Sequence, residues 1–296
     1  MQTLLRNMMP AAWLLAGSLM PGCGDNIGGP GVDILLGLPR DLKAVSVDDA
    51  HVRIFWSASV DTVNSAFAGY VVSYGSVSDS LPESTLEYLA GPFSPGVHVF
   101  TVRSLKANGQ VSNPATILWA PAYRYDAQPL VLLERDPADP TRICGVHAGT
   151  ESTDPFSLEV SAASQPDLDF FLDGLGGQPL LLRGASEFES DWKLTLFSTE
   201  SDSATSLNFP RSTFPADGTF TLTRVTIEDN TIFYAKIVGD SGQSLVVRIH
   251  VRFLAGEFPD RSVEITFSLQ RSAGVPFALL GPTLPVMRDR SGGAQG

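Results

Sequence analysis

The stretch HVRIFW at residues 51–56 places three apolar side chains on one face of an extended chain. GYVVSYG at 69–75 and VHVFTVRSL at 97–105 alternate in the same way. Asn108-Gly109 follows the third stretch, and this dipeptide is typical of a two-residue β-hairpin turn. Short alternating strands at this spacing predict an antiparallel β-sandwich.

Three segments, taken in order, resemble a fibronectin type III domain. They are LPRDLKAVSVDDAHVRIFW at 38–56, GYVVSYG at 69–75 and PGVHVFTVRSLKANGQVSNP at 95–114. The features that match the family are an opening proline, a tryptophan in an early strand, a pair of tyrosines and a glycine turn before the closing strand: Pro39, Trp56, Tyr70, Tyr74 and Gly109. The resemblance implies a β-sandwich domain over residues 38–122.

The chain departs from this family at His98, where the family has its corner tyrosine. A ring nitrogen of histidine can donate a hydrogen bond in place of the phenol hydroxyl, so we expect a structural role for His98. The Asn108-Gly109 loop carries no Arg-Gly-Asp, and the integrin recognition known in some relatives is therefore not implied.

The second half also reads as strands, with no long helical period. SLVVRIHVRF at 244–253 and SVEITFSLQ at 262–270 alternate so regularly that they predict a hairpin with one buried apolar face. Arg248, His250 and Arg252 would then face solvent, opposite Glu264.

The predicted fold class is therefore all-β, with two β-sandwich domains in tandem after a signal peptide. The domains are the fibronectin type III-like one at 38–122 and a second one at 123–283 that resembles no family we recognise. Residues 284–296, which end in RDRSGGAQG, are predicted to be a flexible tail.

The first segment is predicted to be a lipoprotein signal peptide. Residues 1–22 hold a single charge, Arg6, followed by an apolar run of signal-peptide length that is too short and too rich in proline to span a membrane. The end of this run, LMPG before Cys23, resembles a bacterial lipobox, although Met20 and Pro21 depart from its usual residues. The resemblance implies cleavage before Cys23 and a covalent lipid on its sulfur, whereas ordinary secretion with a free Cys23 is the alternative.

Residues 23–37 are rich in glycine, and we expect them to form a tether between the lipid and the first domain. The predicted location is the cell envelope, lipid-anchored to a membrane and facing the periplasm or the cell exterior.

Charge and cysteine content exclude several classes of function. The formal net charge is −12, and no basic stripe occurs, so we expect no nucleic-acid partner. If Cys23 is acylated, Cys144 has no partner for a disulfide, and we expect it to be a buried small hydrophobe. Two cysteines cannot form a tetrathiolate zinc site.

Gly239-Asp240-Ser241-Gly242 resembles the nucleophile segment of trypsin-like serine proteases. The next residue is Gln243 where that family has a second glycine, and His147 lacks the family's surroundings. Asp-Ser-Gly between two strands is also ordinary turn chemistry, which we favour here. The alternative function for the chain is a hydrolase or glycan-processing enzyme with its site in the second domain.

Asp167, Asp169 and Asp173 lie close together in PDLDFFLDGLGG, residues 166–177. Ca²⁺ takes six to eight oxygen ligands, often from clustered carboxylates, but the spacing here is not that of an EF-hand. A solvated strand edge, with Asp167 and Asp169 on one face, is the simpler interpretation, and these three residues are where a cation would be sought first.

Trp119, Tyr123 and Tyr125 cluster where the two domains meet. Exposed aromatic rings there would stack on sugars or bind a partner, and buried rings would be interdomain packing. The pattern as a whole predicts a non-catalytic envelope lipoprotein, a binding or spacer module for an envelope protein or a glycan, with no cofactor beyond the lipid on Cys23.

Overall fold

The structure is a computed structural model that describes residues 36–60, 66–150, 152–174, 179–239, 242–257, 259–272, 274–275 and 277–279. The predicted signal peptide, Cys23, most of the tether and the tail at 284–296 lie outside these residues. Every strand pair is antiparallel, and the described residues contain no α-helix; short 3₁₀ turns lie at Ala162–Ser164, Ala185–Glu187 and Asp217–Thr219. The predicted all-β sandwich class is confirmed.

The first sandwich pairs a three-stranded sheet with a five-stranded sheet. The three-stranded sheet has the order β1 (Arg40–Ser46), β2 (Val52–Ser57) and β5 (Glu87–Ala90). The five-stranded sheet has the order β19 (Ala278–Leu279), β7 (Ala115–Trp119), β6 (His98–Lys106), β3 (Phe67–Tyr74) and β4 (Val77–Leu81).

The alternation of HVRIFW is what positions β2. Val52, Ile54 and Trp56 are buried between the sheets, and Tyr70 and Val72 of β3 meet them from the opposite sheet without exposed surface. The ring of Trp56 packs edge-on against Tyr70 with centroids 5.4 Å apart. The predicted inward faces of both stretches are therefore confirmed.

His98 lies at the start of β6 and makes the contact expected of it. Its Nε2 lies 2.9 Å from the carbonyl oxygen of Ser94, four residues earlier, and the carbonyl accepts the hydrogen bond. The imidazole also stacks on Phe93 at 4.4 Å. The ring thus fastens the loop that enters β6.

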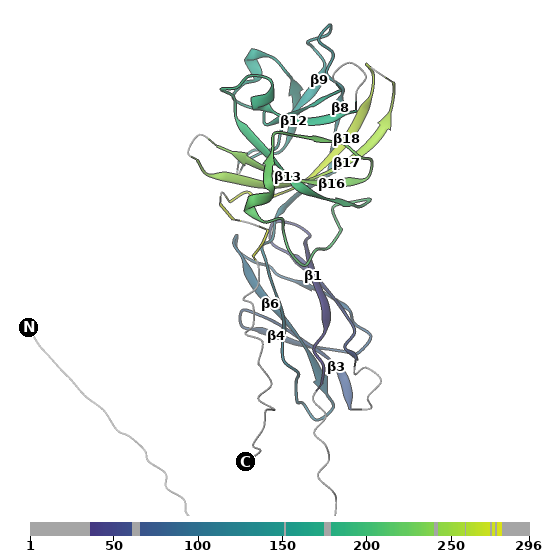
Figure 1. Ribbon diagram of the computed structural model, residues 1–296. Coiled ribbons are helices and arrows are strands. Elements are labelled where there is room, and N and C mark those ends of the chain that lie inside the picture. The colour runs from purple at the N-terminus through teal and green to yellow at the C-terminus, as the bar shows by residue number, and fades with distance from the viewer. Residues whose placement is uncertain are drawn as a thin grey trace, which may run out of the picture. The chain divides into compact units, whose positions relative to one another are not determined.

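The second sandwich pairs a five-stranded sheet with a six-stranded one, and Figure 1 labels β13, β16, β17, β18 and β8 of the larger sheet. The five-stranded sheet is β10 (Phe156–Glu159), β9 (Ile143–His147), β11 (Phe170–Asp173), β12 (Leu181–Gly184) and β15 (Arg224–Thr226). The six-stranded sheet is β14 (Phe220–Leu222), β13 (Leu194–Ser203), β16 (Thr231–Val238), β17 (Ser244–Ala255), β18 (Ser262–Leu269) and β8 (Tyr123–Leu133).

The hairpin predicted from residues 244–270 is present as β17 and β18. Its inward residues, Val247 and Ile249 on β17 and Ile265 and Phe267 on β18, have no exposed surface and join the core between the sheets. Each such side chain contributes about 1.5–3 kcal/mol through burial. Arg252 pairs with Glu264 at 2.8 Å on the outer face, as expected.

The outer face of this hairpin is not fully solvated, which corrects the prediction for Arg248 and His250. Residues 204–220 fold over it and bury Leu207 against Tyr234. Nε2 of His250 donates to the carbonyl of Ala204 at 3.0 Å, and Nη2 of Arg248 donates to that of Phe209 at 2.9 Å. Both side chains are buried because this segment supplies a second cover that strand periodicity does not report.

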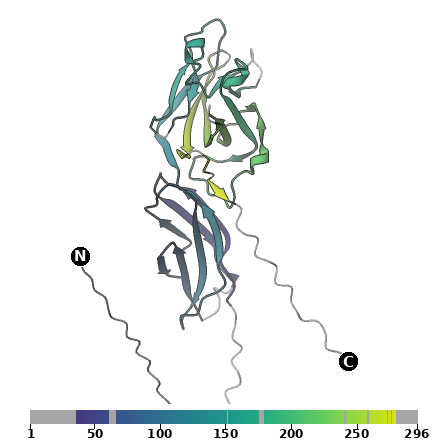
Figure 2. The same cartoon turned by 90° about the vertical axis from the view of Figure 1, so that its left-hand side faces the viewer.

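Strand β19 corrects the expectation that all of 123–283 belongs to the second domain. Ala278 pairs with Trp119 and Leu279 with Leu118, so the chain returns from the second sandwich to complete a sheet of the first. The short yellow arrow of β19 can be followed in Figure 2.

The two sandwiches also share backbone and aromatic contacts. The backbones of Ala44 and Arg211 exchange hydrogen bonds of 2.8 and 3.0 Å. Phe277 stacks on Phe214 at 5.0 Å and packs against Trp119 at 6.5 Å, and Phe214 meets Tyr234 edge-on at 5.1 Å. Apolar packing therefore continues from the first core into the cover of the second.

Candidate functional site

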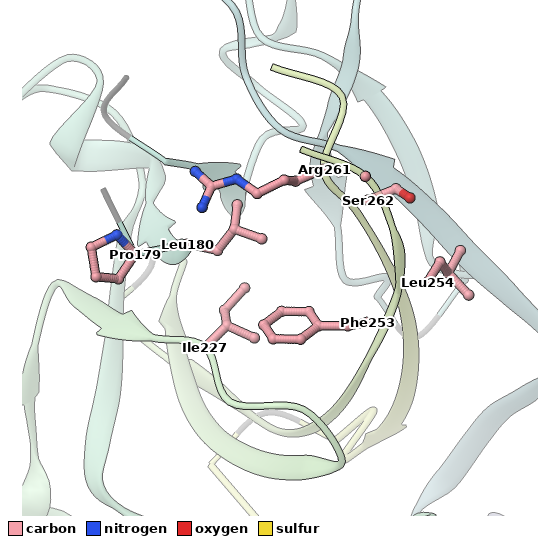
Figure 3. A pocket seen from close by; sticks show the side chains of 8 residues that line it. Pro179, Leu180, Ile227, Phe253, Leu254, Arg261 and Ser262 are labelled. Atoms are coloured by element: carbon pink, nitrogen blue, oxygen red, sulfur yellow. The ribbon is translucent and has the colours of Figure 1, made fainter. Parts of the chain in front are cut away.

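A pocket of about 410 Å³ opens at the end of the second sandwich where β17 turns into β18. Leu180, Ile227 and Phe253 point toward one another across it, whereas Leu254 lies on the other side of its strand (Figure 3). The remaining lining residues are Pro179, Gly256, Arg261 and Ser262. A mostly apolar hollow of this size is typical of a binding site.

Two hydrogen bonds donated by backbone N–H groups hold the walls of this pocket. The N–H of Ile227, just after β15, donates to the carbonyl of Leu180, just before β12, at 2.9 Å. The N–H of Phe253 donates to a carboxylate oxygen of Asp229 at 2.7 Å. Leu180 and Ile227 are buried and belong to the core, but Phe253 keeps 41% of its surface exposed.

One side of the pocket carries an ion pair whose carboxylate is buried and whose guanidinium is partly exposed. The carboxylate of Glu134 is fully buried and accepts hydrogen bonds from Nε and Nη2 of Arg261, both at 2.6 Å. The hydrogen bond to Glu134 is the main cause of the raised pKa of Arg261. This two-bond geometry neutralises both charges and fixes the guanidinium, so the pocket has a rigid polar edge.

The three aromatic residues at the domain junction do not form a stacking platform. Trp119 has no exposed surface, and its indole N–H donates to Ser46 at 3.0 Å. Tyr123 lies under the guanidinium of Arg271 at 3.5 Å, and its hydroxyl donates to Asp154 at 2.8 Å. Tyr125 packs against the second core. The interpretation as packing fits these positions, and Trp192, also buried, lies elsewhere in the core.

The aspartates of residues 166–177 occupy three different environments. Asp167 is exposed in a turn, whereas Asp169 and Asp173 are buried, so the predicted solvated edge is wrong for Asp169. Asp169 pairs with Lys193 at 3.0 Å, and Asp173 pairs with Arg183. Buried carboxylates need such partners. Within the described ranges no three metal-binding side chains gather, and Ca²⁺ gains no support here.

His147 lies beside Asp169 rather than in an open cleft. Its Nδ1 is 2.8 Å from the carbonyl oxygen of Asp167 and 3.3 Å from Oδ2 of Asp169. Its Nε2 is 3.4 Å from the hydroxyl of Thr153, which sits 2.7 Å from the hydroxyl of Thr150. The imidazole is buried and its nitrogens are engaged, as in a structural network. Ser241 of the protease-like segment lies outside the described residues.

Cys144 is the buried small hydrophobe that the sequence predicts. Burial raises the pKa of its thiol to about 11, so the thiol stays protonated and unreactive at neutral pH. Cys23, the predicted lipidation site, lies outside the described residues. Among the residues that are described, no helix has the length and apolar character needed to cross a membrane.

Sequence patterns did not single out the pocket. Phe253 ends an alternating strand and was expected on the buried face, and Leu180, Ile227 and Glu134 come from separate loops and strand ends. One sequence feature near the pocket stands out locally: Glu134 is a charged residue directly after the apolar run of β8. The pocket exists because several strand ends converge, which no short segment encodes.

The fold and site together define a class: an all-β chain of two connected antiparallel sandwiches with an open apolar pocket in the second. Comparison with protein-family models finds no match, and comparison with curated proteins finds none either.

Proposed function

We propose that this chain is a non-catalytic, lipid-anchored lipoprotein of the cell envelope that binds another envelope protein through the pocket at the end of its second sandwich. The observation that carries the proposal is the pocket itself, which is open and apolar and has a rigid charged pair on one side. An apolar hollow of this kind accommodates side chains of a protein partner.

The strand arrangement supports the first domain as a fibronectin type III-like spacer. One sheet holds three strands, the other pairs β7, β6, β3 and β4, and His98 makes a corner contact where that family has a tyrosine. The spacer role is an analogy with the fold, and the binding role is argued from the pocket of the second sandwich.

A protein partner is favoured over a glycan. Glycan sites usually expose aromatic rings, but Trp119 and Trp192 are buried and Tyr123 is covered by Arg271. A hydrolase is less well supported, because His147 and Asp169 are buried and engaged with Asp167, Thr153 and Lys193.

The test of anchoring compares Cys23→Ser with Cys144→Ala, the matched change at the other cysteine. We expect Cys23→Ser to leave the membrane fraction and Cys144→Ala to remain there. If Cys23→Ser stays as firmly bound as the unaltered chain, the lipid anchor is wrong.

The test of binding places a photo-crosslinking amino acid in intact cells at Leu254, a lining residue on the outer side of the strand that carries Phe253, or at Val99, an exposed apolar position of the first sandwich. We expect an adduct of defined mass from position 254, lost when Phe253→Ala is added, and none from position 99. Adducts that are identical from both positions would overturn binding through the pocket.

A further inference from the structure

Three acidic residues adjoin the lining of the pocket along the chain. Glu228 and Asp229 directly follow the lining residue Ile227, and Glu257 directly follows Gly256. All three side chains belong to exposed residues. Asp229 is tied to the site, since it accepts the hydrogen bond from the N–H of Phe253.

These carboxylates are not neutralised by the nearby cations. Arg261 is held by Glu134, and Arg142 pairs with Asp260 at 2.8 Å. Within the part of the chain that the structure describes, no ion pair reaches Glu228, Asp229 or Glu257. Three negative charges therefore lie on residues next to the lining of an apolar hollow, and one of them, on Asp229, is bonded to the backbone of Phe253.

We infer that the pocket binds an aromatic or branched aliphatic side chain presented by a basic segment of the partner, with flanking lysine or arginine residues on the acidic rim. The inference rests on the proposed function and names the chemistry of the partner. Apolar walls supply the energy of insertion, and charge complementarity selects the segment and speeds its capture. An acidic or neutral segment would meet unfavourable charge at the mouth or gain nothing from it.

An apolar occupant is consistent with the hydrogen bonding of the polar groups at the pocket. The Arg261–Glu134 pair satisfies both partners, so the occupant need not supply a charge inside the pocket. The exposed ring of Phe253 offers a surface for an aromatic partner in edge-on or offset packing.

The test uses the detergent-solubilised full chain and three fluorescent hexapeptides with blocked ends: KKLFKK, EELFEE and KKSSKK. We expect KKLFKK to bind about tenfold or more tightly than EELFEE. We also expect KKLFKK to bind more tightly than KKSSKK, and its affinity to fall as salt shortens the Debye length below about 10 Å.

Two variants separate the rim from the walls. Glu228→Gln with Glu257→Gln should weaken KKLFKK about fivefold, while the matched pair Glu83→Gln with Glu87→Gln on the first sandwich should leave its affinity unchanged. Phe253→Ala should abolish the preference for KKLFKK over KKSSKK.

Each contrary result is informative. Equal binding of KKLFKK and EELFEE would overturn the basic partner but leave the pocket and the proposed function standing. Equal binding of KKLFKK and KKSSKK, or no binding of any peptide, would also overturn the inference. Failure of the proposed function is read separately, from the fractionation and crosslinking in cells.

Discussion

His147 and His250 are both buried in the second sandwich, yet their surroundings move the pKa in opposite directions. Burial disfavours the charged form of His147, but the hydrogen bond to Asp169 and the charge of this carboxylate outweigh it and raise its pKa. For His250 burial prevails and lowers the pKa, although the carbonyl of Ala204 accepts a hydrogen bond from its ring. The same residue type thus contributes to stability with two opposite pH dependences.

The signs follow from proton linkage. His147 stabilises the fold fully below its unfolded pKa of about 6.5, and this contribution is lost as the pH rises through its raised folded pKa. His250 costs stability as the pH falls below about 6.5, since the unfolded chain then binds a proton that the folded chain resists.

We therefore expect His250→Gln to reduce the loss of stability on acidification, and His147→Gln to lose more free energy of unfolding at pH 6 than at pH 8. Urea unfolding of both variants and the unaltered chain across this range provides the measurement. Parallel pH profiles of all three proteins would contradict the assignment.

At the scale of elements, the loop before β6 depends on His98. Replacing it with alanine removes the hydrogen bond to Ser94 and the stacking on Phe93, so we expect a loss of about 1 kcal/mol in the free energy of unfolding. His98→Tyr offers a hydroxyl donor and an aromatic ring, and should retain most of the stability. The free energy of unfolding is measured by urea unfolding. An equal loss in His98→Ala and His98→Tyr would argue against a role of His98 in fastening this loop.

Strand alternation predicts the elements of this chain well and their surroundings poorly. It correctly predicts the inward faces of β2, β3 and the hairpin of β17 and β18, because a period of two reports one buried face. It misassigns Arg248 and His250, because residues 204–220 cover the other face from a distance in sequence.

The candidate site is harder to predict from sequence than the strands are. The pattern predicts a solvated edge for Asp169, since nothing local indicates that Lys193 approaches its carboxylate. The pocket is likewise assembled from Leu180, Ile227 and the end of β17, whose proximity is a property of the tertiary fold.

At the scale of the whole molecule, the described residues from Leu36 onward form a single compact unit that holds both sandwiches. Phe277 and Phe214 stack where the packing of the two sandwiches meets, and the backbones of Ala44 and Arg211 are hydrogen-bonded beside them. Unfolding one sandwich would expose these rings on the other, so the two should unfold together.

We expect the unaltered chain to unfold in one transition and Phe214→Ala to separate it into two, while lowering stability by about 3 kcal/mol. Differential scanning calorimetry distinguishes the outcomes, since the calorimetric and van't Hoff enthalpies agree only for a single transition. Phe188→Ala, an aromatic truncation within the second sandwich, is the matched control and should lower the midpoint without splitting it. Two transitions in the unaltered chain would refute the coupling.

The return of β19 to the first sandwich has a mechanical consequence. The second sandwich is joined to the first by two covalent connections, one from β7 into β8 and one from β18 to β19, rather than by a single linker. A pull or a twist applied to the pocket end is therefore divided between two strands of chain and the Ala44–Arg211 backbone bridge. A twisting force is therefore transmitted to the first sandwich, whereas a single linker would let the second sandwich rotate freely.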